Sequence, residues 1–188
     1  MDATDYYTSH PNLVGEKSIG PFVSFYPSLG FVFVNNEGDI VGYIFAAPNL
    51  KEYCERISIA WLPELRLKYP KVEPSEGELL TPCETTINSL HGQDPAIPAG
   101  LDSPETWAIV KLAYLPSVSD YSLARSSTML ILACLRTSGV LRVLAEVPRK
   151  EKYIQDLYTR IGGLIFLGIS LFMKSCCSKD FVYFGKAV

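Results

Sequence analysis

Residues 107–163 alternate apolar runs with amphipathic ones: WAIVKLAYLPSVSDYSLARSSTMLILACLRTSGVLRVLAEVPRKEKYIQDLYTRIGG. The first run, 107–115, predicts a β-strand, and residues 121–137 predict a helix that Gly139 closes. Residues 140–147 form a nearly continuous apolar run, which is typical of a strand covered on both faces. The order therefore predicts a strand, a crossover helix and a buried strand.

A second helix is predicted after that strand, because apolar side chains recur at helical spacing until Gly162 and Gly163 interrupt them. The stripe consists of Tyr153, Ile154, Leu157, Tyr158 and Ile161. Residues 164–173 and 181–184 then predict two last strands.

The N-terminal part begins with a stretch of about 30 residues that mixes Pro, Gly, Ser and aromatic residues. It predicts an irregular start, with one short helix near residues 12–17. Two apolar runs, 31–35 and 40–47, then flank the turn-forming residues 36–39, which is typical of a β-hairpin.

A helix is predicted after the hairpin, since Asn49 with Glu52 three residues later forms a capping-box pattern. We expect this helix to run toward Ile59, and Pro63 to limit its continuation.

Residues 70–104 are rich in proline and are interpreted as an insertion. Within them Thr81, Pro82 and Glu84 fit the N-cap, N1 and N3 positions of a short helix that ends near Leu90. At 188 residues the whole chain, 1–188, is predicted to be a single domain.

The charge balance is even, with 17 Lys and Arg against 20 Asp and Glu, a formal net charge of −3. It gives no reason to expect a nucleic-acid or membrane-surface partner. Five cysteines without disulfide spacing predict a reducing setting, the cytoplasm or the nucleus. The longest apolar run, 161–173, is shorter than the roughly 20 residues that span a bilayer.

The order of strands and helices, together with Glu146 and Val147 at a strand end and the run from Leu157 and Tyr158 to Gly162, resembles the GNAT superfamily of N-acetyltransferases. The resemblance implies an α/β (α+β) fold with a central twisted sheet of antiparallel and parallel strands flanked by helices. It also implies that the helix at 121–137 would hold the pyrophosphate of acetyl-CoA at its N-terminus.

Further motifs lie in a characteristic order along the chain. They are Leu13 to Lys17 (LVGEK), Phe31 to Phe33 with Gly42 and Tyr43, Ile59 to Pro63 (IAWLP), Lys68 with Tyr69, Asp120 with Ser122 to Ala124 and Ser126, Ala133 to Leu135, and Leu157 with Tyr158, Ile161 and Gly162. In this order they resemble the C-terminal acetyltransferase-like domain of the O-GlcNAcase family, which removes N-acetylglucosamine from intracellular proteins. The resemblance implies a glycoside hydrolase parent whose active site lies outside this chain.

The expected phosphate loop lacks the glycines that let backbone N–H groups approach a phosphate. The matching positions, Tyr121, Ala124, Arg125 and Ser126, follow Asp120, whose carboxylate is placed to cap the same helix. We therefore expect neither a cofactor nor a cofactor-binding residue, and no metal, since His10 and His91 lack ligand-spaced partners.

The resemblance places Tyr158 where the family's general acid lies, but its position in the apolar stripe favours a core role. Lys111 and Glu105 are the nearest candidates for a general base, and Glu105 is interpreted as a solvated loop residue. Adjacent Cys176 and Cys177 are interpreted as two faces of one strand.

The sequence therefore predicts a non-catalytic acetyltransferase-like domain that serves protein interaction or assembly, with a protein, a peptide or a second copy as its partner. Phe22, Phe25 and Tyr26 form its expected contact surface. The alternative is an active GNAT enzyme that uses acetyl-CoA on a protein amine, with Tyr158 as acid and Arg125 at the phosphates.

Overall fold

The computed structural model describes residues 8–74, 79–92, 95, 97–98, 101, 103–118, 121–148, 150, 152–165 and 181–187. Its described strands form one sheet in the order β1-β2-β3-β4-β5. The pairs β1–β2, β2–β3 and β4–β5 are antiparallel, and β3–β4 is parallel. The strands are β1 (Gly30–Val34), β2 (Ile40–Ala47), β3 (Trp107–Tyr114), β4 (Arg142–Pro148) and β5 (Phe181–Ala187).

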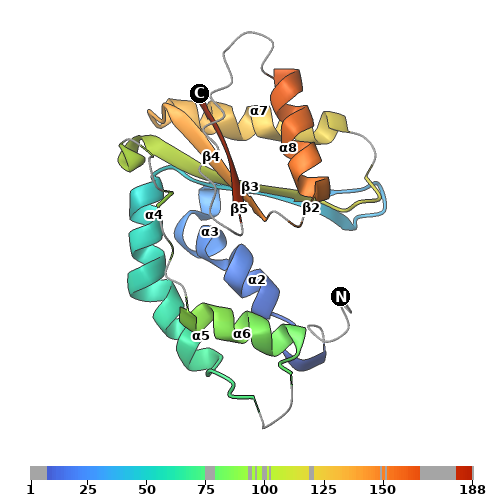
Figure 1. Cartoon of the computed structure of the whole chain (residues 1–188). Helices are drawn as coiled ribbons and strands as arrows, with labels where there is room; N and C mark the ends of the chain where they lie inside the picture. Colours follow the sequence, from blue (N-terminus) through green and yellow to red (C-terminus); the bar gives the residue numbers. More distant parts are fainter. Residues whose placement is uncertain are drawn as a thin grey trace.

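Helices cover both faces of the sheet (Figure 1). One face carries α7 (Tyr121–Thr137) and α8 (Lys152–Ile165), and the other carries α3 (Gly20–Phe25) and α4 (Leu50–Arg56). Farther from the sheet lie α2 (Leu13–Ser18), α5 (Leu62–Lys68) and α6 (Pro82–Gly92), while Pro27–Leu29 and Pro104–Thr106 form 3₁₀ turns. The predicted fold, a mixed twisted sheet flanked by helices, is confirmed.

Two hydrophobic cores sandwich the sheet. On the α7 and α8 face, Ile131, Leu135 and Leu157 pack onto the buried side chains of β2, β3 and β4. On the other face, Phe22 and Leu50 pack against residues that alternate with these along the same strands. As predicted, β4 is covered on both faces.

Three local signals produced the expected structures. The Asn35 side chain accepts hydrogen bonds from the backbone N–H groups of Glu37 and Asp39, which closes the β1–β2 hairpin. The Asn49 side chain accepts from the N–H of Glu52 at 3.0 Å, so the predicted N-cap forms. The capping box of α6 also forms, because Thr81 and Glu84 exchange backbone-to-side-chain hydrogen bonds.

The helix that opens at Asn49 does not stop near Pro63, and this prediction was wrong. A π-helical turn, Ile57–Trp61, joins α4 to α5, and the N–H of Leu62 bonds the carbonyl of Ile57. Since proline at the start of a helical segment gives up an N–H that needs no partner there, the wider turn lets the helix continue to Lys68.

The start of the chain is more regular than expected. The helix expected near residues 12–17 is present as α2 (Leu13–Ser18), but α3 follows at once and turns Phe22 into the core at 2% exposure. The expected contact surface is therefore wrong for Phe22, which is buried. Phe25 and Tyr26 are half-buried, and the Phe25 ring packs edge-on against Trp61. Residues 1–7 lie outside the described part.

The Pro-rich segment contains the predicted short helix, α6, which contributes to a third core. Buried Cys83, Ile87 and Leu90 of α6 pack with Leu13 of α2 and Leu65 of α5. These three helices form the cluster that lies below the sheet in Figure 1.

The end of α8 also differs from the prediction. The helix passes through Gly162 and Gly163 to Ile165, so the first two residues of the strand expected at 164–173 are helical. The rest of that strand, with Cys176 and Cys177, lies outside the described residues. The last predicted strand is present as β5.

Candidate functional site

The parallel pairing of β3 with β4 covers only their first halves. The register runs from Trp107 opposite Arg142 to Val110 opposite Ala145 and then ends. Beyond it, among the described residues, β3 is paired only with β2 and β4 only with β5. The sheet is thus divided at the carboxyl ends of these two strands, the edge where α/β sheets commonly bind ligands.

Tyr158 of α8 reaches into this division. Its hydroxyl accepts a hydrogen bond of 2.7 Å from the backbone N–H of Leu112, two residues beyond the last paired residue of β3. A buried N–H group without a partner is costly, and β4 no longer supplies one at this point. The Tyr158 hydroxyl therefore supplies the hydrogen-bond acceptor that a neighbouring strand would otherwise provide.

The same environment changes the acidity of Tyr158. Burial raises the pKa of its hydroxyl above the ordinary value, and the hydrogen bond from Leu112 offsets part of the rise. A general acid works best when its pKa lies near the working pH. Tyr158 also packs beside the buried Leu157 and Ile161, in the core stripe that the sequence predicted.

The first turn of α7 is the place where the resemblance puts a phosphate. Ala124, at one of the positions where the family carries glycine, is buried against the sheet, and its carbonyl accepts from the hydroxyls of Ser127 and Thr128. Arg125 and Ser126 are exposed. Asp120 and the side chain of Tyr121 lie outside the described residues, so the expected cap at Asp120 stays a prediction.

The two predicted candidates for a general base, Glu105 and Lys111, lie at different positions relative to the end of the β3–β4 pairing. Glu105 is exposed in the 3₁₀ turn before β3, about 23 Å along the chain from Leu112, so it lies at the wrong end of the strand. Lys111 lies just past the end of the β3–β4 pairing.

Sequence reasoning used Glu146 for the family resemblance but did not consider it as a general base. It follows the last residue of β4 that pairs with β3 and lies on the α4 face of the sheet. Burial, and then the charge of Glu146, raises the pKa of the Cys54 thiol to about 11. Burial also raises the pKa of the Tyr53 hydroxyl, with Cys54 and Glu146 adding to the rise. The signal available in the sequence was one acidic residue inside an apolar strand.

Among the described residues, no group of His, Cys, Asp and Glu side chains is arranged to hold a metal ion. The two histidines both contact Tyr69. The His10 ring packs edge-on against the Tyr69 ring at 5.3 Å, and His91 of α6 lies 2.8 Å from the Tyr69 carbonyl through Nε2. In the described part of the chain no helix has the length and apolar character needed to cross a bilayer.

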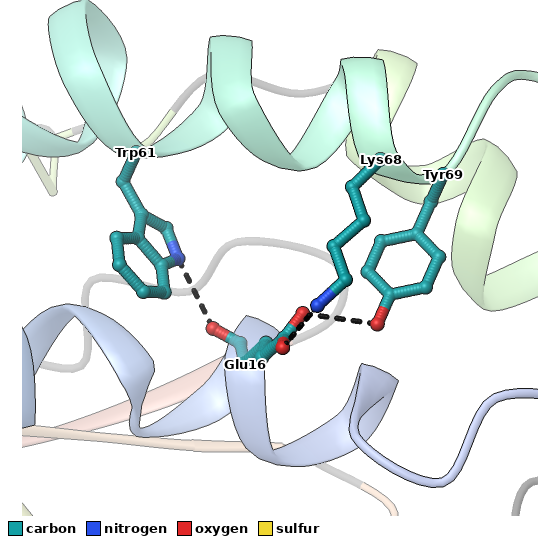
Figure 2. A network of polar contacts seen from close by, with 4 residues as sticks. All are labelled: Glu16, Trp61, Lys68 and Tyr69. Atoms are coloured by element: carbon teal, nitrogen blue, oxygen red, sulfur yellow. Dashed lines mark hydrogen bonds and ion pairs between the residues drawn. The ribbon is translucent and has the colours of Figure 1, made fainter.

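A polar network joins α2 to the helix formed by α4, the π-helical turn and α5 (Figure 2). The Glu16 carboxylate pairs with Lys68 Nζ at 2.5 Å and accepts from the Tyr69 hydroxyl at 2.9 Å. The Trp61 indole N–H donates to the Glu16 backbone carbonyl at 3.1 Å. All four residues belong to motifs that carry the family resemblance, and in this structure they hold helices together.

We expect Glu16→Ala to lower the free energy of unfolding by about 1 to 2 kcal/mol, because the hydroxyl of the buried Tyr69 loses its acceptor. Tyr69→Phe should have a similar effect, since it removes the same bond. Lys68→Met, which removes an exposed charge, should have a much smaller effect. Urea denaturation of the three variants tests this, and equal effects of Glu16→Ala and Lys68→Met would contradict it.

The antiparallel β1–β2–β3 sheet, continued by the parallel β3–α7–β4 unit and by α8, defines an acetyltransferase-like fold of the GNAT kind. A solved crystal structure, that of SsHAT, shares it: the two align with a TM-score of 0.66 over 95% of this chain and 82% of that one. At 20% sequence identity this likeness shows the fold alone.

By sequence the chain is similar to protein O-GlcNAcase of Rattus norvegicus and of Mus musculus, with 27% identity over 188 residues in each case. The alignments cover 97% of this chain but 19% of each relative, so the chain spans about a fifth of their length. No protein-family model matches the sequence. The predicted resemblance to the acetyltransferase-like part of O-GlcNAcase is confirmed.

Proposed function

We propose that this chain is a non-catalytic acetyltransferase-like domain of an O-GlcNAcase-like protein and that it serves protein interaction or assembly. The parent would remove O-linked N-acetylglucosamine from intracellular proteins with an active site outside this chain. The chain would hold no acetyl-CoA and would work in the cytoplasm or nucleus, in keeping with the free thiols of Cys54, Cys83 and Cys134.

One contact supports the non-catalytic assignment above all others, the hydrogen bond from the Leu112 N–H to the Tyr158 hydroxyl. An acyl carrier seated between diverging strands needs backbone donors for its carbonyl and amide groups. Here the donor that β3 offers past its last pair with β4 is used inside the chain. Binding there would require Tyr158 to give up that bond and leave its half-buried position against the core.

The first turn of α7 gives a second argument. A phosphate at a helix N-terminus needs close approach to free N–H groups, which glycines permit. The chain has Ala124 and Ser126 at those positions, and the Ala124 side chain faces the core. The exposed Arg125 remains as a charge, without the backbone cradle that would position a pyrophosphate.

One observation favours the alternative, an active N-acetyltransferase. The Glu146 carboxylate lies just past the end of the β3–β4 pairing and is close enough to Cys54 and Tyr53 to raise their pKa values. A carboxylate at that point could deprotonate a substrate amine. The two functions differ in whether the chain binds acetyl-CoA.

Titration calorimetry of the chain with acetyl-CoA separates them. We expect no binding with a dissociation constant below about 1 mM. Arg125→Ala should then be indistinguishable from wild type. Micromolar binding that Arg125→Ala weakens by about tenfold or more would overturn the proposal in favour of the enzyme.

A further inference from the structure

The outer face of α7 is more apolar than an exposed helix requires. Leu123, Met129 and Leu130 are 37%, 55% and 48% exposed, and Ala133 is exposed beside them. The side of the same helix that faces the sheet is already fully occupied by Ala124, Ser127, Ile131 and Leu135. Single exposed apolar residues are ordinary, but here Leu123 and Leu130 lie about two turns apart on one line of the helix, and Met129 and Ala133 lie about one turn apart on a neighbouring line.

The charged side chains of α7 are all positive. The 17 residues of α7 contain no Asp or Glu, and their only charged side chains, Arg125 and Arg136, are both exposed. They are 11 positions apart, so at 3.6 residues per turn they lie about three turns and 16 Å apart along nearly the same line. Within the described residues neither forms an ion pair.

We propose that this surface, made by Leu123, Arg125, Met129, Leu130, Ala133 and Arg136 and called here the α7 face, binds an acidic amphipathic helix of a partner protein. The proposal rests on the interaction role proposed above. An apolar stripe takes the apolar side of a helix, and an arginine row beside it selects a partner with Asp or Glu about three turns apart.

Charge argues against a second copy as the occupant. If two α7 faces met about a twofold axis with their helices antiparallel, Arg125 of each copy would approach Arg136 of the other. Like charges at an interface are unfavourable, and no acidic side chain of α7 is present to offset them.

The probe is a labelled amphipathic helical peptide with a leucine stripe flanked by glutamates, compared with a matched peptide that carries lysines instead. Fluorescence anisotropy should show that the glutamate peptide binds about tenfold more tightly or better than the lysine peptide at low salt. The preference should shrink at high salt, because exposed charge pairs are screened.

Variants assign the binding to the α7 face. The double variant Arg125→Glu with Arg136→Glu should reverse the preference between the two peptides. The double variant Met129→Ser with Leu130→Ser should lower the affinity for the glutamate peptide by about tenfold. The matched control is the double variant Lys51→Glu with Lys71→Glu, which reverses two exposed charges away from α7. It should lose far less affinity for the glutamate peptide than the arginine variant does. Circular dichroism and thermal melting show whether each variant is folded.

Any of three peptide results would overturn the proposal: no binding of the glutamate peptide, equal binding of both peptides, or an unchanged preference in the arginine variant. Light scattering that shows a dimer dissolved by Met129→Ser with Leu130→Ser would make a second copy the occupant and also overturn it. Acetyl-CoA binding would overturn the proposed function whatever the peptides do. If the peptides fail to bind as expected and acetyl-CoA does not bind either, only the proposal for the α7 face is overturned, and the proposed function stands.

Discussion

Replacing Gly42 with alanine is expected to lower the free energy of unfolding by about 2 to 3 kcal/mol. A Cβ at this buried position would lie 2.5 Å from Cδ1 of the Tyr114 ring and 2.8 Å from the backbone carbonyl oxygen of Ala113. The carbonyl belongs to the central strand β3, and the Tyr114 ring is held by stacking on Phe33 and by a 3.0 Å contact with the Ser127 hydroxyl. Neither can move without loss elsewhere.

Urea denaturation measures this effect, and Gly15→Ala is the matched control. A Cβ at Gly15, inside α2, would have no atom within 4 Å. That variant should be stabilised by about 0.5 to 1 kcal/mol, because alanine is the better helix former. If the two alanine variants were equally stable, the close packing of β2 on Tyr114 would be wrong.

Tyr158→Phe is expected to lower the free energy of unfolding by about 1 to 3 kcal/mol. The ring still fills its place, but the buried N–H of Leu112 loses its acceptor. Tyr153→Phe is the control, since the Tyr153 hydroxyl donates to the Leu115 carbonyl in an exposed contact of 3.3 Å rather than accepting from a buried N–H. A Tyr158→Phe protein as stable as wild type would show that the hydroxyl does not hold β3.

The pH dependence of the same variant gives a second reading. Because the pKa of Tyr158 is raised in the folded chain, the unfolded chain releases this proton first as the pH rises. The stabilisation from Tyr158 is therefore complete below about pH 10, the unfolded value, and is lost above it. The difference between wild type and Tyr158→Phe should shrink above that pH.

The parts of the fold that were predictable depend on neighbours in sequence. The Asn49 and Thr81 caps, the hairpin closed by Asn35 and the strand at 107–115 are each specified by a few adjacent residues. Their physical causes act within one turn of helix or along one strand, so a single sequence reveals them.

The parts that were missed depend on contacts between distant residues. Pro63 predicts a helix end, and only the π-helical turn before it shows why the helix continues. Phe22 in a segment of Pro, Gly and Ser resembles a surface residue until β2 and α4 cover it. The Leu112 to Tyr158 bond joins residues 46 positions apart, so no local pattern in the sequence reveals it.

The most direct test of a closed, non-catalytic site is a crystal structure of the chain grown with millimolar acetyl-CoA. We expect the Tyr158 hydroxyl to remain bonded to the Leu112 N–H, near 2.7 Å, with no ligand between β3 and β4. A structure with the thioester on the Leu112 N–H and the pyrophosphate on the first turn of α7 would contradict it.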